Sequence, residues 1–106
     1  MEELAKAIPD PEMVLALAPE ELGSKLLFLL RQRFGTAVFH PNNLMSEVWG
    51  RHSRHSYAEG RMPEVNLAMA EAWAWLEAQG LVVTDPEQHG GWLRLSRRAR
   101  AMSRWL

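Results

Sequence analysis

The sequence of 106 residues contains no cysteine, so it excludes disulfide bonds, thiolate metal sites and cysteine nucleophiles. It also lacks a long hydrophobic run, because runs such as Leu26 to Leu30 are far shorter than the ~20 apolar residues that a membrane span needs. No glycine-rich loop follows a strand-like segment, which leaves nucleotide binding by such a loop without support. The first residues show no basic-then-apolar signal-peptide pattern. We therefore expect a cytoplasmic chain with no membrane partner.

What the chain does contain fits one folded domain covering residues 1–106, with a core over about 11–100. An apolar share of 47% and a charged share of 24% are typical of a globular protein. The length is close to the commonest domain size, and is sufficient to bury one core without disulfides or metal.

Charge of one sign is missing from whole segments, although the net charge is only −1. Residues 63–90 hold five acids and no lysine or arginine, whereas residues 91–106 hold five arginines and no acid. Residues 1–30 are acidic, with six acids against two bases, and residues 31–62 are basic, with five arginines against two acids. Such segregation favours two opposed surfaces of unlike charge.

Proline and glycine mark the expected helices. Pro11 opens a short helix to about residue 17, and Pro19 opens a longer one that Gly35 ends. Inside it, Gly23 costs about 1 kcal/mol relative to alanine, which is compatible with close packing there. A further helix runs from Pro41 to Gly50, and the polar residues 51–61 that follow form a loop.

The longest helix is expected over 63–79, with Gly80 as its stop. The apolar period then changes from 3.6 to 2, and residues 81–84 and 92–96 read as the two strands of a β-hairpin. Ser96 caps a closing helix whose inward stripe is expected to be Ala99, Met102 and Leu106. The fold class is therefore mainly α with a small β-hairpin (α+β). The element order is that of a winged helix-turn-helix with extra N- and C-terminal helices.

Three motifs resemble those of a known group. They are Pro19-Glu20-Glu21-Leu22, residues 71–83 (EAWAWLEAQGLVV) and residues 91–98 (GWLRLSRR). Over roughly residues 11–100 the chain resembles the amino-terminal winged-helix module of uncharacterised bacterial proteins associated with abortive infection. The resemblance implies a sensing or tethering module of a larger bacterial defence system, and no substrate.

Catalytic and metal sites find little support. His52 and His55 have a His-x-x-His spacing, but two ligands are too few for a metal and no cysteine or neighbouring aspartate adds others. Glu71 and Glu77 are six residues apart on a helix and point in different directions, so they form no acid–base pair. We expect no catalytic residue, no metal and no cofactor, and therefore no enzyme.

The first functional hypothesis is nucleic-acid binding. The helix over 63–79 holds the place of a recognition helix but has no basic residue, which disfavours base readout. Weak, largely sequence-independent phosphate contacts are expected instead, from Arg51, Arg54, Arg61, Arg94, Arg97, Arg98, Arg100 and Arg104. We expect the first three to lie on the same side of the molecule as at least two of the others. Arg97 and Arg98 oppose a helix dipole, so an anion is expected nearby, either phosphate or the acidic segment 63–90.

The alternative hypothesis is a protein-interaction winged helix, or a homodimer, that binds no nucleic acid. The outward face of the long helix is small and apolar, as a packed partner helix would require. Trp73 fits the core face of this helix and Trp75 its flank, and packing is the favoured role for both. The interface residues of this hypothesis are Leu67, Ala70, Ala74, Trp75 and Ala78.

Overall fold

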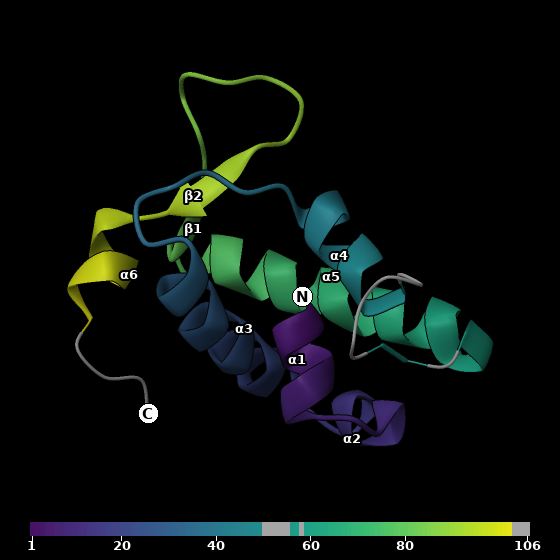
Figure 1. Cartoon of the computed structure of the whole chain (residues 1–106). Helices are drawn as coiled ribbons and strands as arrows, with labels where there is room; N and C mark the ends of the chain where they lie inside the picture. The colour runs from purple at the N-terminus through teal and green to yellow at the C-terminus, as the bar shows by residue number, and fades with distance from the viewer. Residues whose placement is uncertain (50–55, 58, 103–106) are drawn as a thin grey trace.

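The computed structural model describes residues 1–49, 56–57 and 59–102, and it is mainly helical with a small antiparallel sheet (Figure 1). The elements follow in the order α1 (Glu2–Ala7), α2 (Pro11–Leu15), α3 (Pro19–Arg33), α4 (Pro41–Trp49), the 3-10 helix η1 (Glu59–Arg61), α5 (Met62–Ala78), β1 (Val82–Thr84), β2 (Leu93–Leu95) and α6 (Arg97–Ala101). The expected long helix and the hairpin that follows it are thereby confirmed.

Helix ends follow the local chemistry of the sequence. The Asp10 carboxylate accepts the backbone N–H of Glu12 at 2.9 Å and caps α2, whose first residue is Pro11. The Glu21 carboxylate accepts the backbone N–H of Ala18 at 2.8 Å at the start of α3. After α3 the chain turns through Gly35, whose φ of 57° lies in the left-handed region that glycine adopts without strain.

Two terminal helices differ from expectation. Helix α1 was not expected, because residues 2–7 show neither a side-chain cap nor an extended apolar period. Helix α6 begins as expected, with the Ser96 hydroxyl accepting the Ala99 N–H, but it ends at Ala101 and Met102 is already extended. Leu106, expected on its inward stripe, lies outside the described residues.

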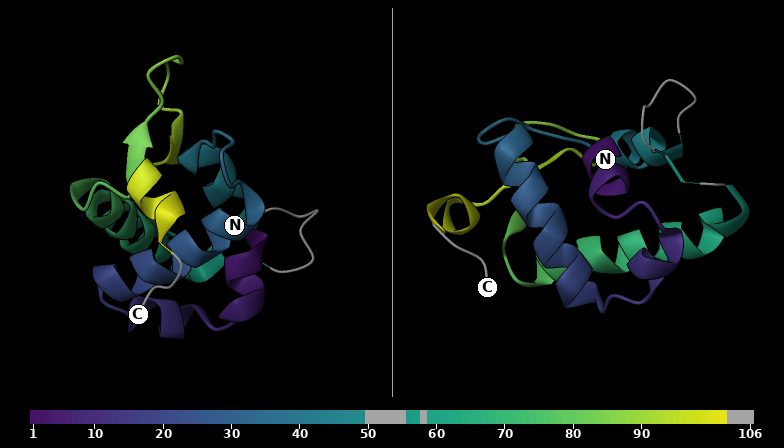
Figure 2. Two further views of the ribbon diagram at one scale, coloured as in Figure 1. Left: turned by 90° about the vertical axis from the view of Figure 1, so that its left-hand side faces the viewer. Right: turned by 60° about the horizontal axis from the view of Figure 1, so that its bottom comes forward.

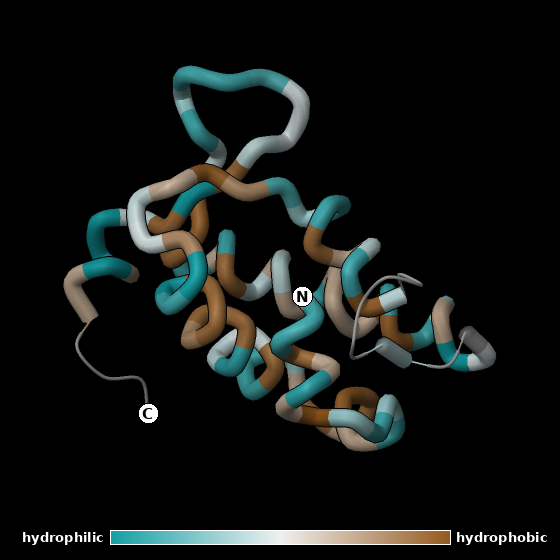
Figure 3. The backbone as a smooth tube through the Cα atoms, viewed as in Figure 1, coloured by the Kyte–Doolittle hydropathy of each residue, from teal (hydrophilic) through white to brown (hydrophobic). Residues whose placement is uncertain are grey.

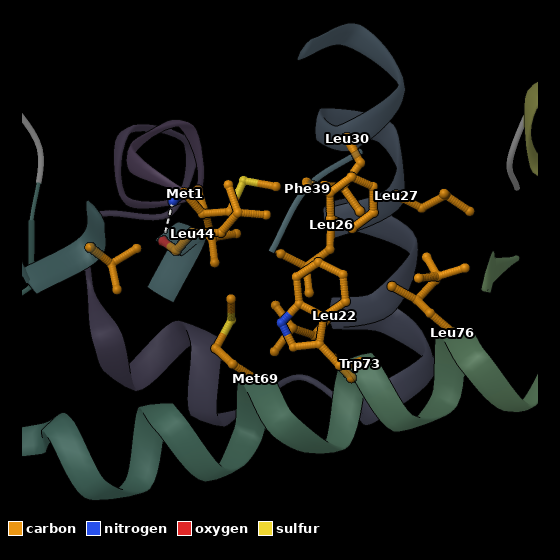
Figure 4. Packing of buried hydrophobic residues seen from close by; sticks show 14 of the residues in the cluster. Met1, Leu22, Leu26, Leu27, Leu30, Phe39, Leu44, Met69, Trp73 and Leu76 are labelled. Atoms are coloured by element: carbon orange, nitrogen blue, oxygen red, sulfur yellow. Dashed lines mark hydrogen bonds between the residues drawn. The ribbon is translucent and has the colours of Figure 1, made fainter. Parts of the chain in front are cut away.

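The core lies where α3 packs against α5 (Figure 4). Leucines of α3 point towards α5, and buried side chains of α5 point back between them. Among these, Leu22, Leu26, Leu27 and Leu30 of α3 and Met69 and Leu76 of α5 are at most 1% exposed. Figure 2 shows α3 running across α5, with α6 beyond the C-terminal end of α5.

The sheet lies above this core. Strands β1 and β2 are antiparallel, with Val82 opposite Leu95 and Thr84 opposite Leu93. Phe39, in the connection between α3 and α4, adds a bridge to Leu93 through two backbone hydrogen bonds of 2.8 Å. Residues 85–92 join the strands as a loop that projects from the body of the molecule and is mostly hydrophilic (Figure 3).

A polar network joins the chain start before α1 to α3 and α4. The amino group of Met1 is buried, and it donates to the carbonyl oxygen of Leu44 and to the Glu47 carboxylate. Arg33 contacts the same carboxylate through two hydrogen bonds of 2.6 and 2.8 Å. These hydrogen bonds, those from Arg33 foremost, lower the pKa of Glu47 from 4.5 to about 2. Burial of the Met1 amine lowers its pKa.

Candidate functional site

Helix α5 has one buried and one free face. Leu67 is 62% exposed, and Ala70, Ala74 and Ala78 are exposed on the same helix. Its other exposed side chains include the three glutamates Glu64, Glu71 and Glu77. We call Leu67, Ala70, Ala74 and Ala78, with Glu71 and Glu77, the α5 face. It presents apolar and acidic groups and no base.

Trp75 does not belong to this face. Its side chain is half-buried and packs against the core, and a Cβ atom built at Gly23 of α3 would lie 2.6 Å from its Cε3 atom. The packing role that the sequence favoured for Trp75 is therefore seen in the structure, and its contribution to an interface stays a prediction. Because Trp75 lies on the flank of α5, its ring packs against Gly23, the glycine of α3.

A groove of about 490 Å³ runs between α4 and α5 beside the α5 face. Helix α4 contributes Pro41, Asn42 and Met45, and α5 contributes Asn66, Ala70, Trp73, Ala74 and Glu77. Its floor is largely apolar, and Glu77 is its one charged lining residue. The Trp73 indole N–H is buried and finds no hydrogen-bond partner within the described ranges.

The expected arginine surface is not assembled around Arg61. Arg61 precedes α5 and makes ion pairs with Glu12 of α2 at 2.7 Å and with Glu64 at 4.0 Å. Arg98 lies at the other end of α5, where it donates to the carbonyl oxygen of Gln79 at 2.5 Å. The 17 residues of α5 separate the two ends by about 25 Å. Arg61 and Arg98 therefore lie at opposite ends of α5, whereas Arg51 and Arg54 of the same expectation lie outside the described residues.

Two of the C-terminal arginines have structural contacts. Arg94 of β2 lies 3.5 Å from the Asp85 carboxylate, which is 3% exposed, and donates to the carbonyl oxygen of Thr36 at 3.2 Å. Arg98 contacts the last turn of α5, where a cation is favourable to the helix dipole. Both contacts hold neighbouring elements together.

Among the described arginines of the set, Arg97 and Arg100 make no such contact. Both are exposed on α6, and neither makes an ion pair with another described residue. Arg51, Arg54 and Arg104 lie outside the described residues, as do His52 and His55. In the part of the chain that is described, no three His, Asp or Glu side chains gather as a metal site would need.

The projecting loop between β1 and β2 carries no lysine or arginine either. Its charged residues are Asp85 and Glu87, and Gly90 and Gly91 both have positive φ. His40 steadies it from the start of α4: its Nε2 donates to the Gly90 carbonyl oxygen at 2.7 Å, while its Nδ1 accepts the N–H of Asn42 at 3.2 Å. The ring also meets the edge of Trp92, with centroids 5.3 Å apart.

The groove was not expected from the sequence. Asn42, Met45 and Asn66 had no assigned role, because the crossing of α4 over α5 is a long-range arrangement that periodicity does not specify. Glu77 was considered only as half of an acid–base pair. The signal that could have found it is the combination of this acid with Ala74 and Ala70, three and seven residues earlier on the same helix.

Within the described ranges, none of the helices combines the length and apolarity that crossing a membrane requires. Comparison with known proteins identifies no relative: no family model matches the chain, and no curated protein or solved structure matches it.

Proposed function

We propose that this chain is a winged-helix domain without a catalytic role, which binds another protein through the α5 face as an attachment or sensing part of a larger assembly. The order of α3, the Phe39 bridge, α4, α5 and the β1–β2 hairpin supports the winged-helix assignment. In that arrangement α5 is the recognition helix and residues 85–92 are the wing.

One observation carries the choice of partner: the recognition helix exposes alanine, leucine and glutamate and has no lysine or arginine. Phosphates would meet Glu71 and Glu77, and like charges repel. The wing adds Glu87 and has no lysine or arginine. Small side chains such as Ala70 and Ala74 instead allow a second protein to approach the helix closely, and Leu67 supplies apolar area to bury.

Nucleic-acid binding is the second candidate, and the exposure of Arg97 and Arg100 favours it. Two cations one helical turn apart, without a carboxylate partner among the described residues, suit phosphate. Such binding would be weak, nearly indifferent to sequence and steeply dependent on salt.

A titration of the ¹⁵N-labelled chain with duplex DNA, at two salt concentrations, separates the candidates. The protein-binding proposal predicts that the amide signals of the α5 face stay unchanged at ~50 mM salt, where non-specific contacts register. Shifts confined to α6 that vanish at higher salt would support the second candidate. Changes in the amide signals of α5 on addition of DNA would overturn the protein-binding proposal.

Replacing Arg97 and Arg100 together with alanine tests the nucleic-acid candidate further, because these are the two exposed arginines of α6 on which it depends. If α6 binds phosphate, the double variant lowers affinity for all sequences alike and flattens the salt slope by up to ~1.8. If duplex DNA does not bind at ~50 mM salt, the second candidate is removed.

A further inference from the structure

The α4–α5 groove has the chemistry to hold an arginine side chain. Ala70, Ala74 and Met45 provide an apolar surface, and the Glu77 carboxylate provides an anion beside it. Arginine combines an apolar stem with a cationic planar end that pairs with carboxylates. Glu71 and Glu77 have no ion-pair partner among the described residues, so both are available to an incoming cation.

Helix α6 carries the matching groups. Arg97, Arg100 and Ala101 lie at spacings of three and four residues and are exposed, whereas Ala99 is fully buried against the core. No described carboxylate pairs with Arg97 or Arg100. A cation in the first turn of a helix opposes its dipole, so an anion beside Arg97 would stabilise α6.

The two surfaces do not meet within one molecule. Helix α6 is held beyond the C-terminal end of α5, by the hydrogen bonds from Arg98 to Gln79 and from the Ser96 N–H to the Leu81 carbonyl oxygen (Figures 1 and 2). The groove instead runs along the side of α5 that faces α4. A net charge of −1 leaves little overall repulsion between copies.

We propose that the α4–α5 groove binds α6 of a second copy of this chain, with Arg97 and Arg100 lying over Ala70 and Ala74 and pairing with Glu71 and Glu77. This proposal rests on the α5 face being a protein-binding surface, as proposed above. The contact joins two different surfaces, so it is heterologous. It involves a five-residue helix, which makes the association weak and sensitive to salt.

Charge reversal on each surface tests the pairing. One variant carries Glu71→Arg and Glu77→Arg, and the other carries Arg97→Glu and Arg100→Glu. Each variant alone presents like charges on both surfaces, so we expect its self-association constant to fall at least about tenfold. An equimolar mixture restores opposite charges at both contacts, so we expect association to return. Sedimentation velocity at low salt measures all three samples beside the original chain.

The control pair is Glu87→Arg in the wing and Lys25→Glu on α3, which change charge at exposed positions away from both surfaces. They should associate as the original chain does, and circular dichroism verifies that every variant is folded. A chain that stays at its monomer mass of 12.1 kDa at about 1 mM protein in low salt would overturn the second copy as the occupant. Self-association that neither charge reversal weakens would also overturn the second copy as the occupant.

These outcomes leave the proposed function separately testable. A monomeric chain whose α5 face still cross-links to a different protein contradicts only the self-pairing. A chain whose α5 face cross-links to no protein contradicts the proposed function itself.

Discussion

Trp75 of α5 and Gly23 of α3 are in direct contact, with the indole ring occupying the space that a side chain at residue 23 would fill. A Cβ atom there would lie 2.6 Å from Cε3 of the ring and 3.5 Å from the carbonyl oxygen of Ala72. The contact joins the two main core helices, and it accounts for a glycine in the interior of α3, where it costs helix stability.

Gly23→Ala is therefore expected to destabilise the fold despite its better helix propensity. Overpacking costs about 1–3 kcal/mol and the propensity gain returns about 1 kcal/mol, so a net loss of up to about 2 kcal/mol should appear in urea unfolding. In a Trp75→Ala background the clash is gone, and the same substitution should be neutral or stabilising. An equal cost in both backgrounds would show that the ring does not set the requirement for glycine.

The Glu47 carboxylate predicts a stability change in acid. Its pKa is lowered to about 2 in the folded chain, chiefly by hydrogen bonds from Arg33, against 4.5 ordinarily. The group therefore contributes stability that is complete above about pH 4.5 and is lost as the pH falls towards about 2. We expect Glu47→Gln to lose less stability between pH 5 and pH 3 than the original chain. Urea midpoints at the two pH values measure this, with the exposed Glu87→Gln as the control, and equal losses would contradict it.

Arg94 and Arg100 should respond differently to truncation. Arg94→Ala leaves the buried Asp85 carboxylate without its cation and the Thr36 carbonyl without this donor, so a loss of about 1–3 kcal/mol in unfolding free energy is expected. Arg100→Ala removes an exposed side chain without an ion-pair partner among the described residues, and should stay within about 0.5 kcal/mol. Equal losses would mean that Arg94 has no structural role.

Zinc is expected to have no effect on stability. His52 and His55 supply too few ligands, and the described ranges contain no metal-binding cluster. Stoichiometric zinc, or a chelator, should leave the melting temperature unchanged. A rise of several degrees with zinc would reveal a site that uses these histidines.

The sequence was sufficient for the elements that local chemistry determines. Helices begin at Pro19 and Pro41, and α5 ends just before Gly80, because proline and glycine constrain the backbone locally. The change of apolar period after Gly80 predicted the hairpin. Helix α1 was missed because its six residues are stabilised by distant contacts, such as that between Met1 and Leu44, more than by local propensity.

Functional surfaces depend on which charges meet in space, and spacing along the chain does not determine this. Arg61 looked free beside other arginines in sequence, yet Glu12, 49 residues away, binds it. Trp75 was expected to pack on the flank of its helix, but the sequence did not show that Gly23 of α3 is the residue its ring packs against. The exposure of Leu67 and Ala74, by contrast, could be foreseen because the period of a single helix sets it.

The most direct test of the α5 face as a protein-binding surface is site-specific photo-crosslinking in the source cells. A photo-reactive phenylalanine analogue replaces Leu67, Ala74 or, as the control, Phe28, which is 52% exposed on α3. We predict discrete protein adducts from residues 67 and 74 and none from residue 28, including an adduct at twice the 12.1 kDa mass of the chain. Ala70→Arg, which adds bulk and a cation to a face proposed to bind arginine side chains, should abolish these adducts. The absence of any protein adduct from residues 67 and 74, or adducts to nucleic acid alone, would contradict the account.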